Sequence, residues 1–279
     1  MASIFPLPAP TLPDFSTLLI NGEYHPSAPI HLALSHINAR DAAKVLILVP
    51  SRTRFTAKVK QAKDDFINKQ GGTGRVAKAA RRVEILYPPT PSHLELLFSL
   101  FHEALVEGKD FLHPKTTFSV SPSLVVLCEP STYFEDQQAT ISSYLAVIFQ
   151  ALSLVNTLSD QCGKPVALAL FDSGLDNLRL PILKLPDSPV IPSEGDSIRA
   201  GIRRESTVEL ARRYFEWVGT VERDDESLSA GRHRYTFRLA HTQSSQEANN
   251  AETFWHWRER VDAEGNVSYD FDSSNDIDS

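Results

Sequence analysis

Short apolar runs that alternate with longer amphipathic segments constrain the fold of this chain more than any other feature. The clearest runs are VLILV at 45–49, VEILY at 83–87, SLVVLC at 123–128 and PVALALF at 165–171. The first of them is aliphatic throughout and ends at Pro50, which is typical of a strand covered on both faces. Parallel neighbours need crossover connections, so we expect an α/β domain whose mostly parallel sheet is flanked by helices.

Helical spacing of apolar residues fills the intervals between these runs. Residues 55–69 place Phe55, Val59, Ala62 and Phe66 on one face and lysines around the others, which predicts a basic amphipathic helix. A glycine-containing loop follows at 70–75.

Two further helices are expected downstream. Ser92 and Glu95 form a capping-box pattern that predicts a helix start. Residues 140–158 carry the strongest helical periodicity in the chain.

The pattern changes beyond residue 206, where short aromatic-rich segments are separated by polar loops. These segments are ARRYFEWVGTVE, HRYTFRLAH, TFWHWRER and NVSYDF. They favour antiparallel strands that complete one edge of the sheet. The cluster of Phe254, Trp255 and Trp257 is then expected to pack at this edge, or to form a partner or DNA surface if it faces solvent.

We predict a single domain over residues 16–271. Residues 1–15 contain four prolines and no Lys or Arg, so we expect a flexible N-terminus that is neither a signal peptide nor a transit helix. Residues 272–279 form an expected acidic tail. No apolar run approaches the ~20 residues of a membrane span, and two cysteines are too few for a disulfide framework, so we expect a reducing intracellular compartment without membrane contact.

Charge is distributed unevenly along the chain, whose net charge is −7. Residues 40–82 hold 12 Lys and Arg against three acidic residues, a net charge of +9, whereas the rest holds 16 basic and 32 acidic residues, a net charge of −16. A basic stretch on an acidic protein points to a localised surface for a polyanion.

The segment TLLINGEYHPSAPIHLAL at 17–34 has the strand, loop and helix order of a phosphate-binding loop. Such a loop needs a second glycine, a lysine and a Ser or Thr, because backbone amides and the ammonium hold the phosphates and the hydroxyl holds magnesium. Gly22 keeps the first glycine's place, but Glu23, His25 and Pro26 follow, and no lysine is present. The aspartate expected after the strand at 123–127 is replaced by Cys128. We therefore expect no ATPase activity, no catalytic residues, no metal and no cofactor at this vestigial loop.

The order of these segments resembles one known family. The resemblance is carried by RRVEILYPPTPSHLELLFSLFHEAL, by PSLVVLCEP and the long helix after it, by ARRYF at 211–215 and by the terminal FWHWRERVDAEGNVSYDF. These segments are similar to the RecA-like recombinase paralogue that partners the SWIM-domain zinc protein in the Shu complex of homologous recombination. The resemblance is to a fungal form with degenerate Walker motifs. The resemblance implies a RecA-like core, a nuclear location, and non-catalytic scaffolding and DNA binding in DNA repair. The implied partners are the SWIM-domain protein, forming a heterodimer, a recombinase, and single-stranded or branched DNA.

The DNA-binding residues expected under this resemblance come from the basic stretch. They are Arg52, Arg54, Lys58, Lys60, Lys63, Arg75, Lys78, Arg81 and Arg82. Cationic side chains that contact phosphates release counterions, and the scarcity of aromatic residues here favours binding that is independent of sequence. A solvated helix face is the other interpretation.

Several alternatives stay open at the level of sequence. FHEA at 101–104 matches the Phe-x-x-Ala pattern of recombinase docking, although Phe101 also continues an apolar helical stripe. A RecA-like structural subunit of an Elongator-type assembly is a second possibility, and an α/β hydrolase that uses Cys128 or Asp172 is a third.

Glu129, Asp172 and Asp176 are weaker candidates for a metal ligand. The histidines fall at no metal-ligand spacing with the cysteines; those considered are His25, His31, His36, His93, His102 and His113.

Overall fold

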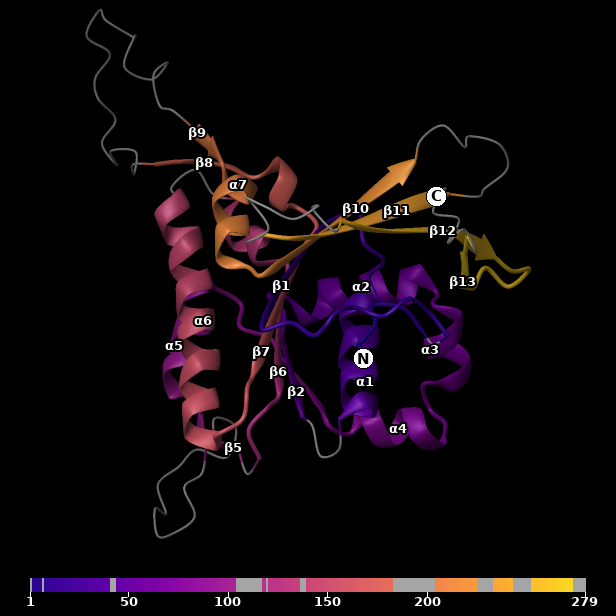
Figure 1. Cartoon of the computed structure of the whole chain (residues 1–279), viewed down its shortest axis with the longest axis horizontal. Coiled ribbons are helices and arrows are strands. Elements are labelled where there is room, and N and C mark those ends of the chain that lie inside the picture. Colours follow the sequence, from indigo (N-terminus) through magenta and orange to yellow (C-terminus); the bar gives the residue numbers. More distant parts are fainter. Residues whose placement is uncertain are drawn as a thin grey trace, which may run out of the picture.

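A nine-stranded sheet with helices on both faces forms the centre of the molecule in a computed structural model (Figure 1). The model describes residues 2–6, 8–40, 44–103, 117–118, 120–135, 139–182, 204–224, 233–242 and 252–272. Strand order across the sheet is β13-β12-β11-β10-β1-β7-β6-β2-β3. The bounds are β1 (Thr17–Gly22), β2 (Val45–Leu48), β3 (Val83–Leu86), β6 (Leu124–Cys128), β7 (Ala167–Asp172), β10 (Trp217–Asp224), β11 (Arg234–His241), β12 (Thr253–Val261) and β13 (Val267–Phe271).

The sheet has a parallel half and an antiparallel half. Strands β3, β2, β6, β7, β1 and β10 run parallel to their neighbours, and β11, β12 and β13 continue antiparallel. The α/β architecture with antiparallel C-terminal strands is therefore confirmed. Its strand order, with β7 between β1 and β6, is compatible with a RecA-like core. Two small ribbons lie outside this sheet, β4 (His102–Glu103) with β5 (Thr117–Phe118) and β8 (Arg179–Pro181) with β9 (Arg204–Ser206).

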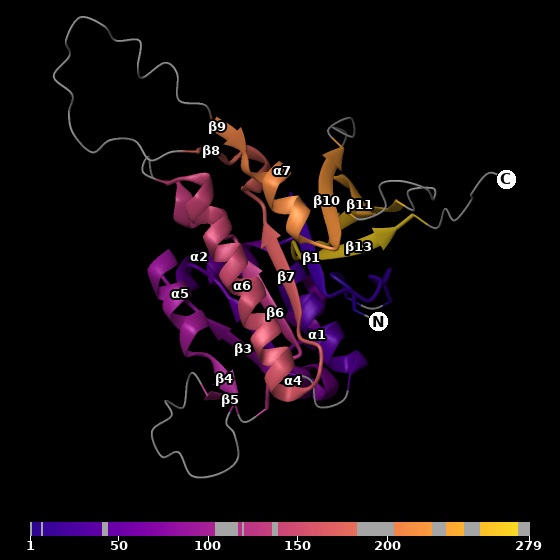
Figure 2. The same ribbon diagram turned by 60° about the vertical axis from the view of Figure 1, so that its left-hand side comes forward.

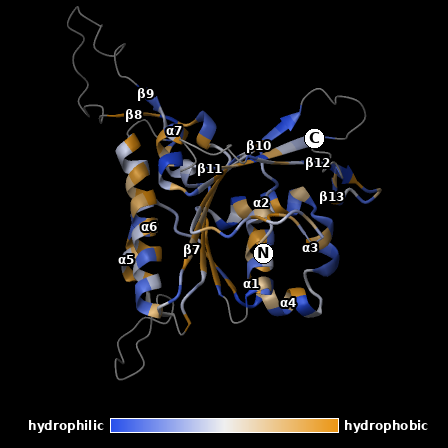
Figure 3. Cartoon of the chain, in the orientation of Figure 1, coloured by the Kyte–Doolittle hydropathy of each residue, from blue (hydrophilic) through white to orange (hydrophobic). Residues whose placement is uncertain are grey.

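Helices cover the two faces of the sheet unequally. One face carries α1 (Ala28–Ala39), α2 (Arg52–Ala62), α3 (Asp65–Gln70) and α4 (Gly74–Ala80), and the other carries α5 (Pro91–Leu100) and α6 (Ile141–Cys162), which pack side by side (Figures 1 and 2). A short helix, α7 (Thr207–Ala211), and single turns at Pro130–Phe134, Leu175–Asn177 and Arg212–Tyr214 complete the described elements. The central strands are the most hydrophobic part of the fold (Figure 3), and β2, β6 and β7 are buried at every position.

Helix α6 is long and apolar enough to cross a membrane by length and composition alone. This corrects the expectation that no apolar segment reaches that length. Eight of its residues, among them Tyr144 and Leu158, are buried against the sheet, which is the ordinary setting of a core helix. Its N-cap Thr140 accepts a hydrogen bond from Ser143 N, where the sequence predicted the helix to begin.

The basic helix predicted over 55–69 is two helices. Lys63 adopts a left-handed conformation with φ 48°, which ends α2, and Asp64 accepts a hydrogen bond from Ile67 N as the N-cap of α3. Phe55 and Phe66 nevertheless pack against the core on the predicted face.

The prediction that a capping box at Ser92 starts the next helix is wrong by two residues. Thr90 caps α5 by accepting a hydrogen bond from His93 N, because Pro91 occupies the first helical turn. Phe101 follows the helix and is buried at 4% exposure, in the core, whereas Ala104 lies outside the described residues. The segment at 211–215 is likewise helical rather than part of a strand.

The N-terminal segment is packed, contrary to the expectation of a flexible N-terminus. Ile4, Phe5 and Leu12 are at most 3% exposed. The ring of Phe5 makes edge contacts with Trp257 and Tyr269 at centroid distances of 4.8 and 5.5 Å. Apolar side chains in this proline-rich stretch thus cover the antiparallel half of the sheet.

The tryptophans of β12 confirm the predicted packed edge. Trp257 is 1% exposed and stacks on Tyr235, and Trp255 stacks on Phe237 at 5.1 Å. Phe254 is 50% exposed. The predicted acidic tail begins with Asp272, which pairs with Arg234 at 2.9 Å; the rest of the tail lies outside the described residues, as does His113.

Candidate functional site

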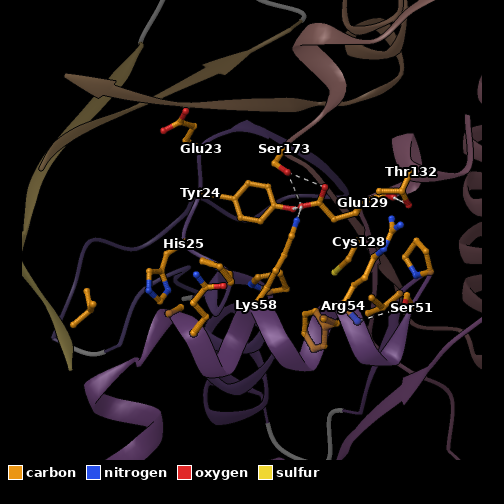
Figure 4. Close-up of a pocket in the computed structure, with 18 of the residues that line it drawn as sticks. Glu23, Tyr24, His25, Ser51, Arg54, Lys58, Cys128, Glu129, Thr132 and Ser173 are labelled. Atoms are coloured by element: carbon orange, nitrogen blue, oxygen red, sulfur yellow. Dashed lines mark hydrogen bonds and ion pairs between the residues drawn. The ribbon is translucent and has the colours of Figure 1, made fainter. Parts of the chain in front are cut away.

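A cavity of about 650 Å³ lies at the carboxyl edge of the parallel strands (Figure 4). Its floor comes from residues directly after β1, β2, β6 and β7, which meet at one edge because these strands are parallel. Helix α2 forms one wall, and Tyr235, Glu259 and Val267 of the antiparallel strands contribute another. Carboxyl edges of open α/β sheets are the usual place for ligands.

Glu129 organises the floor of this cavity. Its carboxylate accepts hydrogen bonds from Tyr24 Oη at 2.6 Å and from Ser173 Oγ at 2.8 Å. The ammonium of Lys58 lies 3.8 Å from Glu129 Oε1, so a helix on one wall is linked electrostatically to the floor (Figure 4). Glu129 also has φ 52°, a left-handed conformation that costs a non-glycine residue about 1–2 kcal/mol and is held here by its neighbours.

Asp64 fills the place beside the N-terminus of α1. The carboxylate is 2% exposed, and its Oδ2 accepts hydrogen bonds from Ser27 Oγ at 2.6 Å and from His31 Nε2 at 2.7 Å. Tyr269 Oη donates to the same oxygen at 3.2 Å. Burial by itself raises the pKa of Asp64, but hydrogen bonds from His31, Ser27 and the Ile67 N–H outweigh it and hold this pKa well below its usual range. A buried carboxylate thus lies beside side chains of the first turn of α1, at Ser27 and His31.

Backbone amides at this terminus are already engaged. The N–H groups of Ala28, Ile30 and His31 donate to the carbonyls of His25 or Ser27, and Pro29 has no N–H. No amide nest for a phosphate remains among these positions.

A glycine is needed at position 22 for backbone packing rather than for binding a ligand. Its φ is +90°, and a Cβ there would lie 2.1 Å from the Val221 carbonyl oxygen. Glycine therefore permits β1 and β10 to approach.

Carboxylates outnumber cations around the cavity. Glu23, Glu129, Glu135 and Glu259 line it, against Arg54 and Lys58.

The nearby titratable groups are shifted by the same surroundings. Burial raises the pKa of Glu259 to about 7, against the opposing effects of the Tyr235 hydroxyl and the charge of Arg223. Burial lowers the pKa of His25 to about 4, so this imidazole is neutral near pH 7.

The two candidate catalytic groups of the hydrolase alternative are both buried. Cys128 is 1% exposed, and burial together with Glu129 and Asp172 raises the pKa of its thiol well above the ordinary value. Burial also raises the pKa of Asp172 to about 7, and this carboxylate accepts hydrogen bonds from Ser131 N and Tyr144 Oη. A protonated, buried thiol is a poor nucleophile, so this arrangement is that of a structural core.

The nine predicted DNA-binding residues separate into two groups. Those of α2 follow β2 and lie at the carboxyl edge of the sheet, whereas Arg81 and Arg82 directly precede β3 at the amino edge. The first group comprises Arg52, Arg54, Lys58, Lys60 and Lys63, and the second comprises Arg75, Lys78, Arg81 and Arg82. The structure does not bring all nine together as one patch.

Within the first group, three side chains are exposed and form no ion pair in the described part of the chain. They are Arg52, Arg54 and Lys60. Lys58 is engaged with Glu129, and Lys63 Nζ donates to the Glu264 carbonyl at 3.1 Å. In the second group, Arg75 donates to Asn38 Oδ1 at 3.2 Å.

Asp64, Tyr24 and Ser173 are the site residues that sequence reasoning missed. The only signal for Asp64 was its helix-capping residue type in front of a helical stretch. Asp176, considered as a metal ligand, accepts a hydrogen bond from Asn21 Nδ2 at 2.6 Å. The described residues contain no group of three or more His, Cys, Asp or Glu arranged to hold a metal ion.

No family model and no curated protein matches this chain.

Proposed function

We propose that this chain is a non-catalytic subunit that binds single-stranded DNA through the exposed cations of α2, within a recombination complex of the Shu type. The observation that carries this proposal is the exposure of cations on α2. Arg52, Arg54 and Lys60 are exposed without ion pairs among the described residues, while the amides of Ala28, Ile30 and His31 in the first turn of α1 are already bonded to carbonyls. The type of complex rests on the sequence resemblance.

The electrostatics favour a polyanion outside the cavity rather than inside it. Exposed cations on a helix contact phosphates and release counterions, whereas Glu23 and Glu129 would repel a phosphate that entered the cavity. ATP is therefore expected to produce no magnesium-dependent thermal shift. A nucleotide affinity in the micromolar range would refute the expectation that no phosphate binds at this loop.

Fluorescence anisotropy of a labelled single-stranded oligonucleotide, measured across a salt series, tests the DNA surface. The three exposed cations of α2 predict that these side chains contribute about −2 to the slope of log K against log salt, so the triple variant Arg52→Gln, Arg54→Gln, Lys60→Gln should reduce the magnitude of the slope by about 2. The matched control is Lys78→Gln, Arg81→Gln, Arg82→Gln at the opposite edge of the sheet. Equal losses in both variants would show that α2 is not the DNA surface.

The partners follow from the same proposal. A SWIM-domain zinc protein and a recombinase should copurify with the tagged chain from nuclear extract, and mass spectrometry identifies them. Recovery from the cytoplasm with neither partner would contradict both the complex and the nuclear location.

The division of the cations between two edges favours a second candidate, a RecA-like structural subunit of an Elongator-type assembly. Such a scaffold needs no continuous DNA surface. It would bind tRNA or protein and show no preference for recombination partners, so the anisotropy series should include a tRNA of matched length.

A further inference from the structure

The ammonium of Lys58 is held only loosely at the cavity. Its ammonium lies 3.8 Å from Glu129 Oε1, farther than the hydroxyl donors of Tyr24 at 2.6 Å and Ser173 at 2.8 Å. The side chain is 54% exposed. A loose, exposed ion pair contributes little to stability, so this ammonium can exchange with another cation at small cost.

The remaining charges of the cavity also favour a cation. With Lys58 and Glu129 counted as a pair, Glu23 and Glu135 face a single further cation of the lining, Arg54, and Glu259, with a pKa of about 7, adds negative charge as the pH rises above neutrality. The buried carboxylate of Asp64 adds negative charge nearby, beside the side chains of Ser27 and His31. A negatively charged ligand would meet net repulsion, and a positively charged one net attraction.

The walls of the cavity are suited to an aliphatic chain that ends in a positively charged group. Aromatic rings of Tyr24, Phe55 and Tyr235 line the cavity together with Val49. The neutral imidazole of His25 lines it as well, with 6% of its side chain exposed. Aliphatic chains pack against such surfaces, and cations are attracted to aromatic faces.

We propose that this cavity binds an ammonium or guanidinium group on an aliphatic stem, and that the arriving cation replaces Lys58 beside Glu129. Two sources share this chemistry, a lysine or arginine side chain of a partner protein and a free polyamine. Arg54 belongs both to this lining and to the DNA surface proposed for α2, but the variants that test the cavity, at Lys58, Glu259 and Gln61, leave Arg52, Arg54 and Lys60 in place, so each proposal can be refuted without the other.

The sign of the Lys58 effect makes the proposal testable. Lys58→Met keeps the stem and removes the competing charge, so affinity for a cationic ligand should rise about three- to tenfold. Affinity for an anionic ligand would fall in the same variant. Lys78→Met is the matched control, because Lys78 is an exposed lysine of α4 outside the cavity.

Two further variants test whether the acidic side chains of the cavity attract the ligand and whether the ligand occupies the volume of the cavity. At pH 8.5, above the pKa of about 7 of Glu259, Glu259→Gln should weaken binding of the cationic ligand about three- to tenfold, whereas Glu95→Gln on α5 should leave it unchanged. Gln61→Trp places a bulky ring at the cavity and should abolish binding; Ala57→Trp adds the same ring at an exposed position of α2 that does not line it.

Isothermal titration calorimetry of the full chain with agmatine, spermidine and a blocked Gly-Arg-Gly peptide provides the measurement. Saturable binding that Lys58→Met strengthens and Glu259→Gln weakens supports the proposal. Tighter binding of the peptide assigns a partner side chain, and tighter binding of spermidine assigns a free polyamine. Absence of saturable binding for all three probes, or a loss of affinity in Lys58→Met, would overturn it. Thermal melts of each variant verify that the chain is folded.

Discussion

Asp64→Asn should destabilise the whole fold, because one buried oxygen of Asp64 accepts three hydrogen bonds. Ser27 Oγ, His31 Nε2 and Tyr269 Oη donate to Oδ2 at 2.6, 2.7 and 3.2 Å. The substitution removes the charge and one of the two accepting oxygens, so in either orientation the new amide donor faces existing donors, the three at Oδ2 or the Ile67 N–H at Oδ1. Breaking a buried charged network of this kind costs about 3–5 kcal/mol. For a chain of this size, that corresponds to a fall in melting temperature of roughly 10 °C.

Urea denaturation followed by circular dichroism measures this loss, and Asp65→Asn is the neighbouring control. Asp65 pairs with Lys69 at 2.6 Å along the surface of α3. An exposed i,i+4 pair of this kind is screened by solvent and contributes little to stability. If Asp64→Asn costs no more than Asp65→Asn, the network does not hold the loop after β1 in place.

The same comparison has a defined pH dependence. Because the pKa of Asp64 in the folded chain lies below its unfolded value, the carboxylate stabilises the fold fully above about pH 4, and this contribution is lost as the pH falls toward the folded pKa. The stability difference between the wild type and Asp64→Asn should therefore narrow from pH 5 to pH 2.5. A difference that widens on acidification would contradict the hydrogen-bonding account.

Two further predictions concern the space around Gly22 and the accessibility of the two thiols. Gly22→Ala should lower the free energy of unfolding in denaturant by at least about 2 kcal/mol, because the new Cβ would lie 2.1 Å from the Val221 carbonyl oxygen at a φ of +90°. The control Gly72→Ala should change it by less than about 0.5 kcal/mol, because no atom lies within 4 Å of that Cβ. With Ellman's reagent at pH 7.5, the half-buried Cys162 should react in the folded chain, and Cys128, at 1% exposure, only on unfolding. Rapid modification of Cys128 would reopen the hydrolase alternative.

Sheet class and strand positions were predictable, because local composition determines them. The buried strands at 45–49 and 123–128 are aliphatic at almost every position, and no neighbour in space changes that interpretation. The break after α2 was not predicted, since it depends on contacts far along the chain. Lys63 donates to the Glu264 carbonyl and accepts from Val267 N, both across about 200 residues.

The state of the phosphate-binding loop was predictable only in part. The missing lysine and the prolines after Gly22 indicated that a phosphate could not be held there. The sequence does not reveal that a buried carboxylate lies beside this loop, because Asp64 lies 37 residues from Ser27 and meets it only once α3 packs beside α1. Division of the basic stretch between two sheet edges has the same origin: the crossover from β2 to β3 returns the chain to the opposite end of the sheet.

Burial of Phe5 against Trp257, Tyr269 and Phe271 imposes an order on folding during synthesis. This apolar stretch precedes β12 and β13 by more than 240 residues, so its aromatic contacts with them form only after both strands have left the ribosome. A bulky group placed just before Phe5 would compete with these closing contacts of the last strands.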